Sequence, residues 1–374
     1  LPKISKIDSI RYSLTYTLRN NSKWDSGVKI SSKDILFSLK VLKLPLLENN
    51  IASAYYSRIK DIIYDSDEGA IFTIIANGNR NDVLRLTGDF PILEKAKFDP
   101  EGLLDSINLS EFDLIPEEIA QNKNVVSFYK NFTKDSYKYN NEFFSSSGSY
   151  RITEIEQGKR ITLTKNENWW GNAMVNGTDY IHANPNEITY YNIPETITAM
   201  YALKTGDIDV MDNIPSNEFT QLENNVEFKK KFNLFTPLKY TFTYIGFNSE
   251  NQHLGDKKIR QALADLIDKT KIVESVESGY AQPTVGPINP AKKFYYNDEI
   301  IPTNYDPSNC IDLLTQAGLR QVNGKWYNKG EGNPIEFTLI HKQNSVYESI
   351  AQIFASEAQK IGIKISIVAY DDRT

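Results

Sequence analysis

The first eighty residues change from an alternating to a helical pattern of hydrophobic positions. Apolar or aromatic side chains alternate with polar ones over residues 12–18, which predicts a strand. Over residues 35–42 the apolar side chains recur at i, i+1, i+4 and i+7, which predicts a helix that begins near the capping-box variant Ser31-Ser32-Lys33-Asp34 and ends before Pro45. Alternation returns over residues 71–75. We therefore expect the amino-terminal part to combine a sheet with helices.

The last third of the chain shows a clearer succession of strands and helices. Residues 240–248, Tyr-Thr-Phe-Thr-Tyr-Ile-Gly-Phe-Asn, favour a strand because β-branched and aromatic side chains dominate them. Asp256 caps a predicted helix, and Asp306-Pro307 opens another that carries Cys310 on its apolar stripe. We interpret Cys310 as a small buried hydrophobic residue and not as a reactive thiol.

The chain closes with the pattern of a βαβ unit. Alternating residues 335–339 and 363–367 flank a helical stripe over residues 346–361. Such a unit predicts parallel strands joined by a right-handed crossover. The loop His341-Lys342-Gln343-Asn344 then lies at the carboxyl end of the first strand, where ligands bind in open α/β sheets.

Length and pattern changes predict several domains. A chain of 374 residues is expected to form two or three. The Ser/Gly cluster of residues 145–149 separates the first block from two strands over residues 150–155 and 160–165, and the pattern changes again near Tyr240. We expect domains at residues 1–145, 146–243 and 244–374, and an α/β fold class.

Composition excludes some classes of partner and leaves others open. The 42 Lys and Arg against 48 Asp and Glu give a net charge of −6, so no general basic face is available for nucleic acid. The 22 Tyr suit either a recognition surface or ordinary packing of a half-buried sheet. No apolar run reaches the roughly 20 residues that span a bilayer. The first residues lack the regions of a signal peptide, so we expect any such peptide to lie outside this sequence.

The sequence contains no recognisable catalytic or metal-binding motif. His182, His253 and His341 are far apart, which gives no support for a zinc site. A calcium loop counted from Asp207 fails at its sixth position, where Asp212 replaces the required Gly. We also find no nucleophile elbow, no zinc-protease motif and no dinucleotide fingerprint. We therefore predict no catalytic residues, no metal and no cofactor, while an enzyme with a dispersed site stays an alternative.

Several segments in order resemble the family 5 solute-binding proteins of ABC importers, the oligopeptide, dipeptide and nickel-binding group. Each segment is weak alone, but their order and spacing are specific. They are Tyr16-Thr17-Leu18-Arg19, Lys23-Trp24-Asp25-Ser26-Gly27, Ser31-Ser32-Lys33-Asp34-Ile35-Leu36-Phe37-Ser38, Phe90-Pro91-Ile92-Leu93, Gly148-Ser149-Tyr150, Lys165-Asn166-Glu167-Asn168-Trp169-Trp170-Gly171, Ala202-Leu203-Lys204-Thr205-Gly206-Asp207-Ile208-Asp209-Val210, Ile259-Arg260-Gln261-Ala262-Leu263-Ala264-Asp265-Leu266-Ile267-Asp268, Gly279-Tyr280-Ala281-Gln282-Pro283, Tyr305-Asp306-Pro307 and Ile361-Gly362-Ile363-Lys364-Ile365.

The resemblance implies a two-lobed periplasmic-binding-protein fold of class II, cluster C type, with an extra domain and a hinge cleft, in the manner of a Venus flytrap. Residues 1–145 would form the extra domain, residues 146–243 part of lobe one and residues 244–374 part of lobe two. Family members carry a strand region before the first motif and a longer stretch after the last one. The acidic residue that pairs with a peptide's amino terminus lies in that later stretch, so this anchor cannot be carried over.

The resemblance further implies a monomeric, non-catalytic protein that captures a peptide-like solute and delivers it to the permease subunits of an ABC importer. We expect a periplasmic or membrane-anchored lipoprotein. The alternatives are a dispersed-site hydrolase or peptidase, and a signalling or adhesion protein that retains the binding fold. Nickel or haem binding is disfavoured by the presence of only three His and three Met.

Polar and aromatic residues at the expected cleft form the candidate binding set. Lys342 can pair with a carboxylate, and the amides of Gln343 and Asn344 can donate and accept hydrogen bonds. His341 shares their loop, Tyr244 offers a flat wall with one hydroxyl group, and Asn248 lies at the expected hinge. We interpret Trp169-Trp170-Gly171 as part of the lobe-one scaffold and not as a stacking platform for a ligand.

Overall fold

The computed structural model describes residues 1–47, 50–64, 66, 69–134, 139–174, 183–330 and 332–370. The chain divides into two compact units, Leu1–Pro194 (unit 1) and Glu195–Thr374 (unit 2), and each is described by itself. The expected boundary at residues 145 and 146 separates two sheets, yet both sheets lie in unit 1. The three-part division therefore stays a prediction.

Unit 1 contains an antiparallel sheet in the order β1-β2-β4-β3. The strands are β1 (Lys3–Lys6), β2 (Arg11–Thr17), β3 (Ile59–Tyr64) and β4 (Ile71–Asn77). Alternation places Leu14 of β2 opposite Ile74 of β4, and both side chains are fully buried. The predicted strands near residues 12–18 and 71–75 are thereby confirmed, except that β2 ends before Leu18.

The predicted capping box begins helix α1 (Ser32–Leu42). Its buried Asp34 carboxylate accepts the backbone N–H of Ser31 at 2.9 Å and that of Lys95 at 2.8 Å. The indole N–H of Trp24 donates to the same carboxylate at 3.4 Å. One carboxylate therefore joins the Trp24 turn, the start of α1 and the segment near Lys95.

Short helices complete the first part of unit 1 and surround two hydrophobic clusters. They are α2 (Asn50–Tyr56), α3 (Arg80–Gly88), α4 (Lys95–Phe98), α5 (Glu111–Leu114), α6 (Pro116–Gln121) and α7 (Lys123–Phe132), with single turns η1 (Pro45–Leu47) and η2 (Asn141–Phe143).

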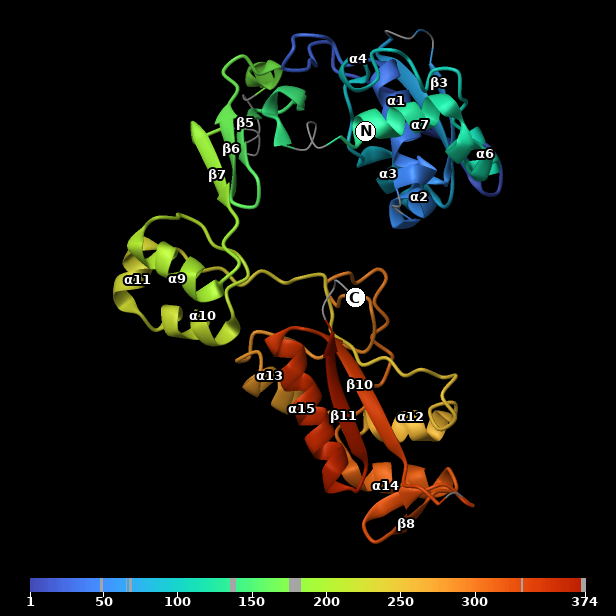
Figure 1. The fold of residues 1–374 in the computed structure, drawn as a ribbon, viewed down its shortest axis with the longest axis vertical. Coiled ribbons are helices and arrows are strands. Elements are labelled where there is room, and N and C mark those ends of the chain that lie inside the picture. Colours follow the sequence, from blue (N-terminus) through green and yellow to red (C-terminus); the bar gives the residue numbers. More distant parts are fainter. Residues whose placement is uncertain are drawn as a thin grey trace. The chain divides into compact units, whose positions relative to one another are not determined.

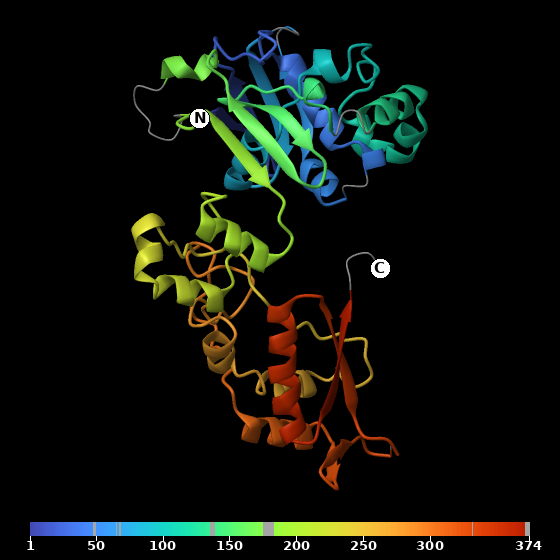
Figure 2. The same cartoon turned by 60° about the vertical axis from the view of Figure 1, so that its left-hand side comes forward.

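A second antiparallel sheet follows in unit 1. Its strands are β5 (Tyr150–Glu156), β6 (Arg160–Lys165) and β7 (Glu187–Tyr191), which lie side by side in Figure 2. The turn η3 (Trp170–Met174) follows β6. The strands predicted over residues 150–155 and 160–165 are confirmed.

Unit 2 begins with helices and ends with the predicted βαβ unit. Strands β10 (Glu336–Lys342) and β11 (Lys364–Tyr370) are parallel, and α15 (Ser345–Lys360) connects them and lies along them in Figure 1. Cys310 is buried in the same core, as predicted. The remaining elements of unit 2 are α9 (Thr196–Thr205), α10 (Ser216–Glu223), α11 (Val226–Lys231), α12 (Lys257–Ala264), α13 (Lys269–Ser275), α14 (Pro307–Gln316), β8 (Arg320–Val322) and β9 (Lys325–Tyr327).

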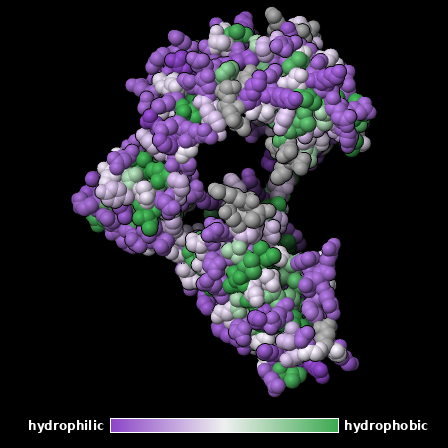
Figure 3. Space-filling model, viewed as in Figure 1, coloured by the Kyte–Doolittle hydropathy of each residue, from purple (hydrophilic) through white to green (hydrophobic). Residues whose placement is uncertain are grey.

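The strand predicted at residues 240–248 does not form, so that prediction is wrong. Ile245 and Phe247 pack against the core of unit 2, whereas Tyr240, Phe242 and Tyr244 are exposed. Among the described residues, no hydrogen-bond partner faces the backbone groups of residues 240–247. Residues with high strand propensity form a strand only where a neighbouring strand can hydrogen-bond to their backbone N–H and C=O groups. Other surface regions of unit 2 are also hydrophobic (green in Figure 3).

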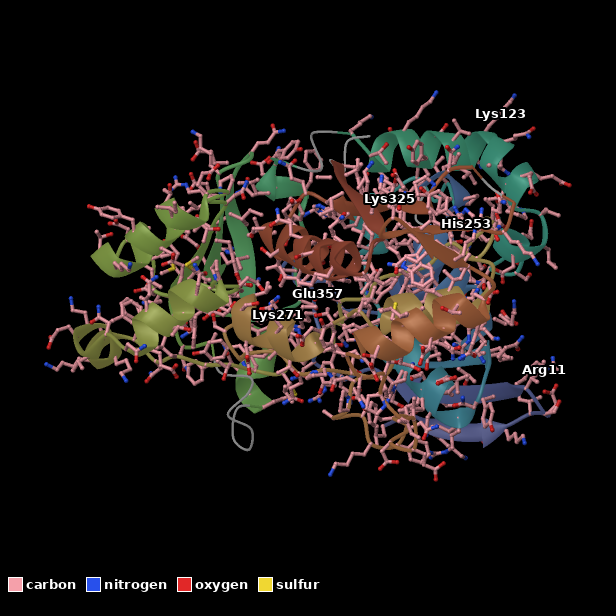
Figure 4. All side chains as sticks on the ribbon, turned by 90° about the horizontal axis from the view of Figure 1, so that it is seen from below. Arg11, Lys123, His253, Lys271, Lys325 and Glu357 are labelled. Carbon is pink, nitrogen blue, oxygen red and sulfur yellow. The ribbon has the colours of Figure 1, made fainter. Side chains whose placement is uncertain are left out.

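A buried carboxylate joins three segments of unit 2. Glu357 on α15 accepts the Tyr305 hydroxyl at 2.7 Å, the Lys271 ammonium at 3.1 Å and the Lys360 ammonium at 2.8 and 2.7 Å. Figure 4 shows Lys271 and Glu357 next to each other. Burial alone would raise the pKa of Glu357, but these hydrogen bonds lower it to about 2. The bond from Tyr305 to Glu357 raises the pKa of Tyr305 to about 12.

Candidate functional site

The structure gathers four of the sequence-predicted residues at the carboxyl end of β10. His341 and Lys342 are the last residues of this strand, so they are not loop residues as predicted. The His341 ring is buried, with Nδ1 2.8 Å from the Lys342 carbonyl and Nε2 2.8 Å from Glu348 Oε2. His341 therefore links the strand end to α15.

The Asn344 side chain also holds the start of α15 in place. Its side chain accepts the backbone N–H groups of Val346 and Tyr347 at 2.9 and 3.3 Å and thus caps α15. Such caps are worth about 1 kcal/mol to a helix. Both His341 and Asn344 position this edge, and their part in contacting a solute stays a prediction.

Lys342 and Gln343 are exposed at the same edge. The Gln343 backbone N–H donates to the Tyr370 carbonyl at 2.9 Å and extends the pairing of β10 with β11. Its amide side chain offers both a donor and an acceptor, and the Lys342 ammonium offers a positive charge. This edge can therefore hydrogen-bond to the carbonyl, amide or carboxylate groups of a solute.

Tyr244 and Asn248 lie in the extended segment that precedes α12. The Tyr244 side chain is 73% exposed, and its ring centroid is 5.4 Å from that of Phe242. The Asn248 side chain accepts the backbone N–H of Glu250 at 3.0 Å and so shapes a local turn. The Tyr244 ring is thus exposed and the Asn248 side chain is engaged in the turn, and the part of both residues in contacting a solute stays a prediction.

Sequence reasoning missed an open groove of about 830 Å³ in unit 1. We call it the tyrosine groove. Residues of β2, α2 and α3 line it together with Leu1, Pro2 and Asp89, and its walls include Tyr16, Tyr55, Tyr56, Leu84 and Arg85. The only sequence signal was the high tyrosine content, because these residues come from three separate elements.

Two tyrosines of this groove are held firmly. The Tyr16 ring stacks on Phe72, its cross-strand neighbour, with centroids 5.4 Å apart. Thr87 gives its hydroxyl proton to the Val83 carbonyl at 2.7 Å, so it accepts the Tyr16 hydroxyl at 2.8 Å. Burial raises the pKa of Tyr16, which keeps this hydroxyl protonated as a donor.

Tyr56 and Tyr55 form the opposite part of the wall. Their rings meet edge to face with centroids 5.2 Å apart, and Tyr56 also meets Phe90 edge to face at 6.4 Å. The Tyr56 hydroxyl donates to the Asp89 carbonyl at 3.4 Å. Burial, with smaller contributions from Tyr55 and Asp89, raises the pKa of Tyr56. Tyr55 is 43% exposed and is therefore the most accessible ring of the pair.

A second groove, of about 840 Å³, brings two sequence motifs together in unit 1. The Asp25 backbone N–H donates to the Ser146 carbonyl at 2.7 Å, which joins the Trp24 turn to the Ser/Gly cluster. The indole N–H groups of Trp169 and Trp170 both donate to the Ser147 carbonyl at 2.9 Å. These contacts favour the scaffold role that we predicted for the two tryptophans.

The described residues contain no group of three or more His, Cys, Asp or Glu side chains arranged to hold a metal ion. His182 lies outside the described residues. Burial raises the pKa of the Cys310 thiol to about 12. Within the described part of the chain, no helix combines the length and the apolar character needed to cross a bilayer.

Comparison with known proteins identifies the family. The family model described as bacterial extracellular solute-binding proteins, family 5 Middle, matches residues 11–374. The chain belongs to this family. The resemblance that the sequence motifs indicated is thereby confirmed.

Curated members of family 5 match the chain at low identity. The oligopeptide-binding protein AppA of Bacillus subtilis is 26% identical over 352 residues, which cover 93% of this chain and 56% of AppA. The nickel-binding periplasmic protein of Escherichia coli is 22% identical over 231 residues, which cover 60% of this chain and 41% of that protein. The chain thus spans little more than half of AppA.

Solved family 5 structures show the same fold. NikZ from Campylobacter jejuni in complex with Ni(L-His) gives a TM-score of 0.71 at 22% identity, with coverage of 100% of this chain and 64% of NikZ. AppA from Bacillus subtilis in complex with a nonapeptide gives 0.64 at 22% identity, with coverage of 99% and 65%. The predicted α/β periplasmic-binding-protein fold class is confirmed.

Proposed function

We propose that this chain is part of the solute-binding component of an ABC importer and that its solute is peptide-like. The observation that carries the proposal is the family match over residues 11–374. Relatives are named for oligopeptides, murein peptide, glutathione, nickel and heme, so peptides and peptide derivatives recur among them.

The side chains at the β10 edge support a peptide-like solute. Each peptide group that enters a site and loses water costs about 1–3 kcal/mol unless it finds a hydrogen-bond partner. The exposed Gln343 side chain supplies both a donor and an acceptor at the β10 edge. We place Tyr244 with the binding residues because its ring is exposed.

Uptake by an importer sets the expected location and partners. The protein meets its solute outside the cytoplasmic membrane and docks on the permease subunits as a monomer, either in the periplasm or as a membrane-anchored lipoprotein. A gene whose coding sequence starts without a signal peptide or lipobox would contradict this location.

The decisive experiment is native mass spectrometry of the full-length protein, followed by denaturation and identification of the small molecules released. We expect peptides or peptide derivatives. Release of only a metal complex or haem would refute the peptide class. Incubation with a peptide library provides the control for the alternative, because a hydrolase would cleave peptides that a binding protein returns intact.

For the contacts at the β10 edge, the matched measurement is calorimetric titration of the identified solute into a Lys342→Ala/Gln343→Ala double variant of the full-length protein, which keeps the Asn344 cap of α15. We expect weaker binding with the fold retained. Unchanged affinity would remove this edge from the binding site.

A further inference from the structure

We propose that His341 and Glu348 form a proton-dependent pair that holds the carboxyl end of β10 in its binding position, so that the protein captures its peptide-like solute more tightly in acid. This inference rests on the proposed function and concerns the same edge of unit 2. It makes Glu348 a positioning residue, because Glu348 acts on this edge through His341.

Both ring nitrogens of His341 face oxygen atoms. Nδ1 lies 2.8 Å from the backbone carbonyl of Lys342, and Nε2 lies 2.8 Å from Oε2 of Glu348. A carbonyl and an ionised carboxylate only accept hydrogen bonds, whereas a neutral imidazole has a single N–H group. The ring can therefore donate to both oxygens only as the imidazolium cation. Its contact with Glu348 is then also an ion pair.

Loss of one proton leaves a lone pair of the ring facing one of the two oxygens. The His341 side chain is only 7% exposed, so little water reaches the ring to replace the lost hydrogen bond. One contact involves the last residue of β10, and the other involves the first turn of α15. Either loss therefore loosens the edge at which Lys342 and Gln343 are exposed.

Glu348 is the charged partner of the ring. Its second oxygen accepts the Gln352 amide at 2.7 Å, and the partial positive charge of the helix N-terminus favours its ionised form. The other described titratable groups of β10, β11 and α15 are exposed or pair with one another. Lys342, Tyr347 and Tyr370 are exposed, Glu336 pairs with Lys364, and Glu357 pairs with Lys360.

Glu348→Gln separates the proton from the shape of the pair. The amide oxygen of the new side chain can still accept from Gln352, while its amide N–H group can donate to the unprotonated Nε2 of a neutral ring. Nδ1–H of that neutral ring still donates to the Lys342 carbonyl. The variant should therefore hold the edge in place without a proton on Nε2.

The first measurement follows the proton itself in the full-length protein. Imidazole ¹⁵N NMR spectra of histidine-labelled protein distinguish an imidazolium ring from a neutral one. This sequence contains three His, and the signal that disappears in His341→Gln belongs to His341. We expect an imidazolium ring at pH 5.5.

The second measurement is calorimetric titration with trialanine at pH 5.5 and pH 7.0. These values lie within the range in which histidine side chains change charge, while both peptide termini stay largely ionised. We expect the wild-type protein to bind trialanine about threefold more tightly at pH 5.5 than at pH 7.0. Glu348→Gln should lower this ratio to about one and keep the affinity of the acid form at both pH values.

Two further variants test the assignment to His341. His341→Gln removes the titrating ring and should also lower the ratio to about one. His253→Gln is the matched control, because it removes the other described histidine and should leave the ratio unchanged. Circular dichroism melting curves of all variants verify that the fold is retained.

The outcomes distinguish this inference from the proposed function. If the wild-type protein binds trialanine at neither pH, the peptide-binding function fails and the inference fails with it. If trialanine binds equally well at both pH values, or if Glu348→Gln keeps the pH dependence, only the inference is overturned. A neutral His341 ring at pH 5.5, or loss of the pH dependence in His253→Gln, would overturn it as well.

Discussion

Replacement of Glu357 by Gln should destabilise unit 2 measurably. The substitution preserves the shape of the side chain but removes the charge that Lys271, Lys360 and Tyr305 share. The pKa of Glu357 is lowered from 4.5 to about 2, and each pKa unit corresponds to about 1.4 kcal/mol. The charged form is therefore favoured by roughly 3 kcal/mol in the folded chain.

Rehydration of the two lysine side chains reduces the expected loss in the free energy of unfolding. The side chains of Lys271 and Lys360 are 47% and 60% exposed, so both can return to water when the carboxylate is gone. We expect Glu357→Gln to lower the free energy of unfolding by about 2–3 kcal/mol at pH 7. For a unit of this size, the melting temperature should fall by roughly 4–12 °C.

Urea unfolding at several pH values provides the assay. Because the pKa of Glu357 is lowered in the folded chain, its contribution is complete above pH 4.5 and disappears as the pH falls through about 2. The curves of the wild type and Glu357→Gln should therefore converge in acid. The control is Glu336→Gln, which removes an exposed ion pair with Lys364 and should cost under about 1 kcal/mol. Equal losses in the two variants, or a difference that persists at pH 2, would refute the reasoning.

Three further predictions address single groups. Tyr305→Phe should lower the free energy of unfolding by about 1 kcal/mol at pH 7, because the hydrogen bond to Glu357 is lost. Urea unfolding measures this loss, and an unchanged stability would contradict the hydrogen bond. The difference should vanish above pH 12, because the raised pKa of Tyr305 makes its contribution complete below pH 10 and absent above about 12. Cys310 should resist a thiol reagent at pH 8 until the chain unfolds, and stoichiometric labelling of the native protein would contradict its burial. Trp170→Ala should lower the melting temperature and leave solute affinity measurable in the folded protein. An unchanged melting temperature with lost affinity would show that Trp170 contacts the solute and does not serve as scaffold.

Elements whose signals are local could be predicted from sequence. Helix α1 follows from the spacing of its apolar residues and from the Ser31–Asp34 pair, whose atoms lie within one turn. The βαβ unit follows in the same way, since two alternating runs and one helical stripe permit few arrangements. Family membership was also readable, because many short motifs in fixed order carry more information than any one of them.

The errors arose where a residue depends on distant partners. Residues 240–248 have strand propensity, but hydrogen bonding in a sheet is supplied by another strand, which the pattern of one segment does not reveal. His341 looked like a loop residue, but Glu348 on α15 and the end of β10 hold its ring in the interior. The tyrosine groove combines three elements separated along the chain, so no spacing in the sequence points to it.

The extended segment at residues 240–247 also has a consequence for handling the chain in solution. A run with high β-propensity and unpaired amides can serve as a template for a strand from a second molecule, and natural sheets protect such edges with charges or proline. Thr241 and Thr243 alternate with the exposed aromatic residues of this segment. Aggregation of the isolated chain should therefore rise steeply with concentration, and Thr243→Pro, which removes one amide donor, should slow it without altering the packed side chains of Ile245 and Phe247.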